Sequence, residues 1–211
     1  VGYSEVDKKI NSVCPYCGVG CQIEYNVKDN KIKYVNGIDG PANKNRLCVK
    51  GRFGFDYVNN PERLTKPLIR IKGKNKDLHP SINFTNIHEY FREATWEEAI
   101  NYAAEGFLEL KKKRNGKSNL AGFGSAKCSN EEAYLFQKLI RTGFNTNNVD
   151  HCTRLCHASS VAALLETIGS GAVTAPFYEV EHSDVIIVIG ANPTENHPVA
   201  ATFFKNAAKK G

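Results

Sequence analysis

Four cysteines constrain this chain more than any other feature of its sequence. Three of them fall within the eight-residue run CPYCGVGC, as Cys14, Cys17 and Cys21, and Cys48 follows after 26 further residues. Three close thiols and one remote thiol suit a [4Fe–4S] cluster, because each of its four irons takes one thiolate. The glycines between the cysteines allow the loop to fold around such a cluster with its amides toward sulfur.

A zinc ribbon is the alternative for these four cysteines. Zinc ribbons normally use two separated C-x2-C pairs, whereas the second half of this pattern offers Cys48 alone. The spacing therefore favours an iron–sulfur cluster. Lys50 follows Cys48 by two residues. It is either an ordinary surface lysine or a cation between the cluster and a second anionic redox group, and the residues alone leave both interpretations open.

The bulk properties indicate an ordinary globular protein of one or two domains. The chain has 211 residues, of which 41% are hydrophobic and 24% charged, and it contains no apolar run long enough to span a membrane. The net charge of +6 comes largely from lysine-rich surface such as residues 109–117, and no nucleic-acid motif accompanies it. Seven cysteines without a signal peptide favour metal binding or catalysis in a reducing compartment.

The predicted fold class is α/β, in two parts. Residues 7–65 form a small β-rich domain, in which the alternating segments 21–27 and 31–37 predict a β-hairpin. A proline-containing linker at 57–70 leads into a short strand at 68–72, and residues 73–94 show little regular pattern.

Residues 66–211 alternate helical and strand-like patterns, which predicts an α/β domain with a mainly parallel sheet. Helices are expected after two capping boxes, Thr95 with Glu98 and Ser129 with Glu132. Further helices are expected at 158–169 and 197–210, and strands at 119–125 and 183–192. The last helix reaches Gly211 without a closing strand, so we expect this domain to be truncated.

The run HCTRLCH places His151 and Cys152 in mirror order to Cys156 and His157. A clamp for one metal ion would need adjacent residues to converge, although neighbouring side chains point apart. The alternative is one thiolate that binds a redox metal, with the next residue as a proton carrier. Cys128 and Cys152 are expected to be small buried residues.

The motifs CPYCGVGC and LCVKG resemble the N-terminal iron–sulfur domain of molybdopterin oxidoreductases that carry bis(molybdopterin guanine dinucleotide). The segments NNVDHCTRLCHASS and EVEHSDVIIVIGANPTENHPVAATF resemble the formate dehydrogenase α subunit in particular. The resemblance covers nearly the whole chain. It implies a [4Fe–4S] cluster held by Cys14, Cys17, Cys21 and Cys48, with Lys50 between that cluster and one pterin.

The resemblance also implies roles in the later part of the chain. Cys156 stands where the family places the cysteine or selenocysteine bound to molybdenum or tungsten, and His157 is the family's proton-handling histidine. Gly190, Asn192 and Glu195 match a segment that contacts a guanine dinucleotide arm, although ordinary turn chemistry explains these residues equally well. The ASS that follows His157 departs from the GPS of some family members.

The reaction implied is oxidation of formate to carbon dioxide, one proton and two electrons, the electrons passing to partner subunits of NAD/flavin or ferredoxin type. The family's substrate-binding arginine lies downstream of these residues, so the chain alone is not expected to turn over formate. One alternative is a related nitrate reductase, in which methionine typically follows the metal-binding cysteine; this chain contains no methionine. Another is a non-catalytic iron–sulfur subunit like that of respiratory NADH dehydrogenase, against which Cys156 and His157 argue.

The expected location is cytoplasmic. The chain begins at Val1, however, and a twin-arginine export signal lost with the start would direct the protein to the periplasm. The residues do not choose between molybdenum and tungsten, or between electron acceptors.

Overall fold

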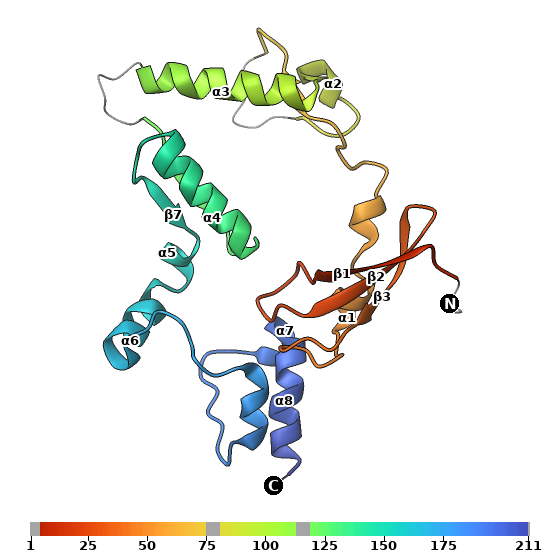
Figure 1. The fold of residues 1–211 in the computed structure, drawn as a ribbon, viewed down its shortest axis with the longest axis vertical. Coiled ribbons are helices and arrows are strands. Elements are labelled where there is room, and N and C mark those ends of the chain that lie inside the picture. Colours follow the sequence, from red (N-terminus) through yellow and green to blue (C-terminus); the bar gives the residue numbers. More distant parts are fainter. Residues whose placement is uncertain (1–4, 75–80, 113–118, 211) are drawn as a thin grey trace. The chain divides into compact units, whose positions relative to one another are not determined.

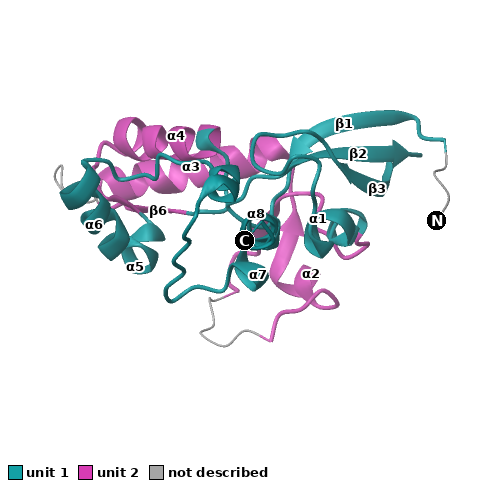
Figure 2. Cartoon of the chain, turned by 90° about the horizontal axis from the view of Figure 1, so that it is seen from below, with its two compact units in different colours: residues 1–59, 125–130, 151–211 teal, residues 60–124, 131–150 magenta. Residues whose placement is uncertain are grey.

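A computed structural model describes residues 5–74, 81–112 and 119–210. The chain forms two compact units (Figure 2). Unit 1 comprises Val1–Asn59, Ser125–Asn130 and His151–Gly211, and unit 2 comprises Asn60–Gly124 and Glu131–Asp150. Unit 1 contains all four cysteines of the first motif and both members of the Cys156–His157 pair.

Unit 1 begins with an antiparallel sheet in the order β1-β2-β3 (Figure 1). Its strands are β1 (Lys8–Val13), β2 (Gln22–Lys28) and β3 (Lys31–Gly37). The predicted hairpin is confirmed, and its two turn residues, Asp29 and Asn30, both have positive φ, as a tight two-residue hairpin turn requires. Strand β1 was not predicted, because all six of its residues are exposed and it lacks a clear apolar alternation.

The other elements of unit 1 are short helices and one longer terminal helix. They are α1 (Val49–Phe53), η1 (Asp56–Asn59), α5 (Thr153–Cys156), α6 (Ala158–Ile168), η3 (Phe177–His182), α7 (Pro193–Asn196) and α8 (Pro198–Ala208). The helices predicted at 158–169 and 197–210 are confirmed as α6 and α8. Gly169 ends α6 with a φ of 70°, the left-handed conformation that glycine adopts at helix C-termini.

The strand predicted at 183–192 is wrong. Residues 185–189 have no regular hydrogen-bonded structure, and the side chains of Val185, Ile187 and Ile189 are 78%, 78% and 86% exposed. A strand that is apolar on both faces requires neighbouring strands and covering layers, because its backbone groups cannot pair alone. Among the described residues no strand pairs with this segment. The extended parallel sheet expected here is therefore absent from the part of the chain that the structure describes.

Unit 2 contains two pairs of strands, β4 with β5 and β6 with β7, and the longest helix among the described residues. Its elements are β4 (Leu68–Arg70), α2 (Ile87–Tyr90), β5 (Phe91–Glu93), α3 (Trp96–Lys112), β6 (Gly122–Gly124), α4 (Asn130–Lys138), the π-helical turn η2 (Leu139–Gly143) and β7 (Val149–His151). Helix α4 begins, and β7 ends, at the boundary with unit 1. The strands predicted at 68–72 and 119–125 are confirmed as β4 and β6.

The start of α3 follows the predicted capping box in part. The backbone amide of Glu98 donates to Thr95 Oγ1 at 3.1 Å, while the Glu98 carboxylate pairs with Arg92 instead of reaching back to the cap. The prediction that 73–94 is irregular is wrong for its later residues, which form α2 and β5; residues 75–80 lie outside the described residues. Strand β5 pairs antiparallel with β4, a long-range contact that local pattern does not reveal.

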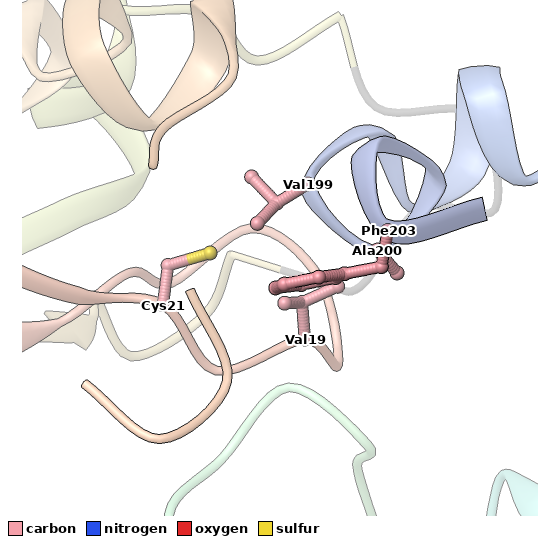
Figure 3. Close-up of a cluster of buried hydrophobic side chains, with 5 residues drawn as sticks. All are labelled: Val19, Cys21, Val199, Ala200 and Phe203. Carbon is pink, nitrogen blue, oxygen red and sulfur yellow. The ribbon is translucent and has the colours of Figure 1, made fainter. Parts of the chain in front are cut away.

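A core of unit 1 joins residues from opposite ends of the chain (Figure 3). Val19 and Cys21 come from the cysteine loop, and Val199, Ala200 and Phe203 come from α8; all five are buried. Phe203 is 2% exposed. Burying one large apolar side chain of this kind contributes about 1.5–3 kcal/mol, so α8 is a substantial part of what stabilises the cysteine loop.

Within the described residues, no helix has the length and apolar character needed to cross a membrane.

Candidate functional site

The first three cysteines lie on the loop between β1 and β2. Cys14 directly follows β1 and Cys21 directly precedes β2, and the Cys14 amide donates to the Cys21 carbonyl at 2.8 Å. The Gly20 amide donates to the Cys17 carbonyl at 3.4 Å, and Gly20 has a φ of 69°. An L side chain rarely adopts that conformation, so glycine is needed for the loop to return to β2.

Cys48 reaches the same region through residues 38–47, and Asn43 holds that segment in place. Asn43 is fully buried and accepts a hydrogen bond from the Gln22 amide at 3.0 Å. Its amide nitrogen lies 3.1 Å, 3.2 Å and 3.1 Å from the carbonyl oxygens of Gln22, Ile38 and Arg46, respectively. Gln22 is the neighbour of Cys21, so Asn43 ties the segment that ends at Cys48 to the strand that begins after Cys21. Sequence reasoning missed Asn43, because an asparagine in the run GPANKN is also typical of a surface turn.

The four cysteines share one environment. Cys48 precedes the first residue of α1, and a side-chain carbon added at Gly51 would lie 3.6 Å from Cys14 Sγ, so α1 lies against Cys14. Cys14, Cys17 and Cys48 pack against the core that contains Cys21.

The thiols also interact electrostatically. Burial, together with smaller contributions from the negative charges of Cys14, Cys17 and Cys48, raises the pKa of Cys21 to about 12. The pKa of Cys14 is raised chiefly by burial, with smaller increases from Cys48 and Cys17 and a lowering by the backbone amide of Tyr16. A group of thiols that oppose one another's ionisation is suited to binding cations, which relieve that repulsion.

A four-iron cluster fits this arrangement better than a single ion. Among the described residues, no group of three or more His, Cys, Asp or Glu side chains could hold one metal ion. A [4Fe–4S] cluster does not require such convergence, since each thiolate binds a different iron. A side-chain carbon added at Gly18 or at Gly20 would have no atom within 4 Å, so there is space beside the loop.

Lys50 lies in α1, two residues after Cys48, and is exposed. Its carbonyl accepts a hydrogen bond from the Gly54 amide at 2.8 Å, which is ordinary helical structure. The predicted role of the Lys50 side chain stays a prediction.

The second candidate site lies where α5 gives way to α6. Cys156 is the last residue of α5, and His157 is the junction residue between the two helices. Cys156 Sγ lies 3.6 Å from His157 Nε2, and both side chains are exposed. One thiol and one imidazole are thus adjacent and accessible, as a metal ligand with a neighbouring proton carrier would need to be.

The mirror pair has a different local role. His151 Nδ1 lies 2.7 Å from Thr153 Oγ1 and accepts from the Thr153 amide at 3.2 Å, while Cys152 Sγ lies 3.8 Å from the same nitrogen. His151 is therefore occupied at the start of α5. The four residues do not converge on one ion.

The expectation that Cys128 and Cys152 are buried is wrong. Both are exposed: Cys152 precedes α5, and Cys128 lies in a loop, where its thiol donates to the Ser125 carbonyl at 3.0 Å.

Gly190, Asn192 and Glu195 lie before and within the short helix α7. Gly190 has a φ of 63° with no atom within 4 Å of a would-be side chain. The Asn192 carbonyl accepts from the Glu195 amide at 3.1 Å, and its side-chain oxygen accepts from the Thr194 hydroxyl. These contacts are the ordinary hydrogen bonds of a turn and of a helix start. The Glu195 side chain is exposed, and its contact with the cofactor stays a prediction.

The small antiparallel domain with four clustered thiols, joined to an α/β segment with an exposed Cys–His pair, defines an iron–sulfur oxidoreductase. Comparison with known families makes this specific. The family model "Molybdopterin oxidoreductase Fe4S4 domain" matches residues 7–60, and the model "Molybdopterin oxidoreductase" matches residues 63–211. The chain belongs to the molybdopterin oxidoreductase family, and its two matched parts imply an iron–sulfur cluster and a molybdopterin cofactor. The predicted division between residues 65 and 66 stays a prediction.

Individual relatives are similar over almost the whole chain. The chain is 43% identical over 203 residues to "Probable oxidoreductase YjgC" of Bacillus subtilis (strain 168). It is 40% identical over 203 residues to "Putative formate dehydrogenase SAR2393" of Staphylococcus aureus (strain MRSA252). Each alignment covers 96% of this chain but 19% of the relative, so the chain spans about a fifth of the length of these relatives.

Proposed function

We propose that this chain forms part of the catalytic subunit of a formate dehydrogenase, which oxidises formate to carbon dioxide, one proton and two electrons. The observation that carries the proposal is the exposed Cys156 thiol with the His157 imidazole 3.6 Å away, in a chain of the molybdopterin oxidoreductase family. The 40% identical relative from Staphylococcus aureus, named "Putative formate dehydrogenase SAR2393", agrees with it.

Cys156 and His157 have separate roles in this proposal. Cys156 would supply a soft thiolate ligand to the molybdenum or tungsten of a bis(molybdopterin guanine dinucleotide) cofactor. When bound, that centre supplies the two-electron redox chemistry of the reaction. His157 Nε2 holds or releases the proton that formate loses, because an imidazole nitrogen can both accept and donate a proton.

The four cysteines of the first motif then form the electron exit. Cys14, Cys17, Cys21 and Cys48 would each hold one iron of a [4Fe–4S] cluster. Lys50, two residues after Cys48 in α1, would lie between that cluster and one pterin. Gly190, Asn192 and Glu195 contact a guanine dinucleotide arm, the glycine by allowing close backbone approach. Partner subunits of NAD/flavin or ferredoxin type receive the electrons, and the location is cytoplasmic.

The test uses the intact gene product, purified anaerobically. Formate-dependent reduction of a dye is measured beside nitrate reduction, with molybdenum and tungsten determined on the same sample. The proposal expects formate turnover and one of the two metals. Nitrate turnover without formate turnover points to the nitrate reductase alternative, and absence of both metals points to a non-catalytic iron–sulfur subunit.

A variant pair tests the role of His157. His157→Ala is expected to lower formate oxidation about 10²–10⁴-fold, the usual contribution of a positioned acid or base, with metal content unchanged. His151→Ala is the matched control, since His151 bonds to Thr153 at the start of the same helix and takes no part in the proposed chemistry. Equal activity of His157→Ala and the parent enzyme would remove the proposed proton role.

A further inference from the structure

Arg46 precedes Cys48 by two residues, and its side chain leaves the cysteine segment to contact η3 and α8. The Arg46 guanidinium carbon lies 4.4 Å from the centre of the Phe203 ring, and Arg46 Nη2 lies 3.9 Å from Glu181 Oε1. Asn206 Nδ2 donates to the same glutamate oxygen at 2.5 Å, which fixes the carboxylate between the guanidinium and α8. One cation thus bridges the segment that ends at Cys48 and two elements that lie about 130 to 160 positions later in the sequence.

The surroundings of Arg46 differ from those of an ordinary surface arginine. Its side chain is 36% exposed, and Nη1 is buried with no hydrogen-bond partner among the described residues. Its stacking partner Phe203 is 2% exposed and belongs to the core that contains Cys21 (Figure 3). Cys48, Cys14 and Cys17 pack against this core. The positive charge therefore lies against one aromatic ring of the core that the four thiols share.

A second cation of the same segment makes a parallel contact. Lys44 Nζ lies 5.4 Å from the centre of the Tyr178 ring, and Tyr178 is itself packed against the core. Asn43, directly before Lys44, is turned inward toward the Gln22, Ile38 and Arg46 carbonyls. The segment before Cys48 is thus held by Asn43 and by two cations over aromatic rings of η3 and α8.

We propose that Arg46 is a positioning residue for the iron–sulfur cluster, which anchors the Cys48 segment to α8 and places a positive charge beside the cluster, partly balanced by Glu181. This inference rests on the proposed assignment of the four cysteines as cluster ligands. It adds a residue, and a charge pair, that the cysteine pattern does not contain.

The electrostatic consequence has a defined sign. A [4Fe–4S] cluster with four thiolates is anionic, and reduction adds one more negative charge. A nearby cation stabilises the reduced form more than the oxidised form, and a nearby carboxylate does the opposite. Removing the charge of Arg46 should therefore lower the cluster's reduction potential, and removing the charge of Glu181 should raise it. A residue with a purely packing role would not produce opposite shifts at these two positions.

The experiment uses the full-length protein, purified anaerobically with its cofactors. The electron paramagnetic resonance (EPR) signal of this cluster is identified as the one lost in a Cys48→Ser variant, and its midpoint potential is measured by redox titration. The variants are Arg46→Gln, Arg46→Lys and Glu181→Gln. The matched control is Arg70→Gln, since the Arg70 guanidinium carbon lies 4.6 Å from the Phe91 ring centre within unit 2, which contains none of the four cysteines.

The expected result is a lower midpoint potential in Arg46→Gln, a higher one in Glu181→Gln, and no change in Arg70→Gln. Arg46→Lys keeps the charge and should restore most of the potential, while the loss of stacking on Phe203 should make the cluster release iron to a chelator faster than in the parent protein. If Arg46→Gln does not fold, the midpoint potentials of the other two variants test the proposal. The potential of Glu181→Gln should be higher than that of the parent protein, and the potential of Arg46→Lys should stay close to it.

Two outcomes overturn the proposal, and they are distinguishable. A signal that Cys48→Ser removes, with the same potential in the Arg46 and Glu181 variants as in the parent, refutes the role of Arg46 and leaves the ligand assignment intact. A signal that no substitution of Cys14, Cys17, Cys21 or Cys48 removes refutes the ligand assignment itself, and the inference fails with it.

Discussion

Replacing Asn43 by alanine removes one hydrogen-bond acceptor and both N–H donors of a side chain at the centre of the cysteine domain. The side chain is fully buried and bonds to the Gln22 amide and to the carbonyls of Gln22, Ile38 and Arg46. A buried hydrogen bond contributes roughly 0.5–1.5 kcal/mol net, and groups left without a partner cost more. We expect Asn43→Ala to lower the free energy of opening of this region by about 2–4 kcal/mol, allowing for water that enters the space.

Hydrogen exchange measures this loss directly. The Gln22 amide is protected by Asn43 Oδ1, and about 1.4 kcal/mol corresponds to a tenfold change in an equilibrium constant. Exchange in peptides that contain Gln22 should therefore accelerate by roughly one and a half to three orders of magnitude. The control is Asn60→Ala, because Asn60 is exposed and its side chain caps only the Glu62 amide. Exchange at Gln22 as slow as in the parent protein would show that Asn43 does not hold the segment.

Two further perturbations test local features of the fold. Gly122→Ala should destabilise unit 2 by about 1–3 kcal/mol in thermal or urea unfolding, because the added carbon would lie 2.5 Å from Ile140 Cδ1. Gly106→Ala in α3 should stabilise unit 2 by about 0.5–1 kcal/mol, because the added carbon would have no atom within 4 Å. Equal effects of the two substitutions would refute the packing argument. The pKa of Cys21 is raised from an ordinary 9.0 to about 12 in the folded state. Between these two pH values the thiol is neutral in the folded protein but ionised in the unfolded chain. The melting temperature of the cluster-free protein should therefore fall as pH rises from about 9 toward 12. A Cys21→Ser variant should show a shallower fall, and an unchanged slope would assign the effect to other groups.

Local sequence pattern predicts the elements whose stabilising contacts are themselves local. The hairpin of β2 and β3 follows from alternation and an Asp-Asn turn, and α3, α6 and α8 follow from apolar periodicity and caps. Strand β1 was missed because its support comes from pairing with β2 and not from its own composition. The apolar run at 185–189 has the composition of a strand, yet it lacks paired neighbours among the described residues, so composition alone led to the wrong prediction.

The candidate site also contains some residues that the sequence reveals and others that it does not. The spacing of the four cysteines points to an iron–sulfur cluster, and the resemblance to molybdopterin oxidoreductases points to the Cys156–His157 pair. Asn43 and Arg46 could not be found in this way. An asparagine and an arginine in a polar loop resemble any turn residue, and their importance arises from partners that are distant in sequence, such as Gln22 for Asn43 and Phe203 for Arg46.

The compact units and the predicted boundary at residues 65 and 66 divide the chain differently. Unit 1 joins residues 1–59 to residues 151–211, because α8 supplies three of the five side chains in the core that contains Cys21. A chain limited to residues 7–65 would expose the faces of Val19 and Cys21 that Val199 and Phe203 cover. The loss is about 4–6 kcal/mol if two large apolar side chains and one alanine are withdrawn. That is comparable to the whole stability of a small domain, which is typically 5–15 kcal/mol.

We therefore expect residues 7–65 alone not to hold a stable cluster. The measurement is iron and sulfide content after reconstitution, with circular dichroism on the same sample, for residues 7–65 and for the full-length protein. Phe203→Ala in the full-length protein is the matched perturbation, and it should weaken cluster retention without removing α8. A 7–65 piece that folds and retains its cluster as firmly as the full-length protein would show that the cysteine loop is stabilised by its own sheet and by Asn43. The contact with α8 would then serve only to join the two family-matched parts of the chain.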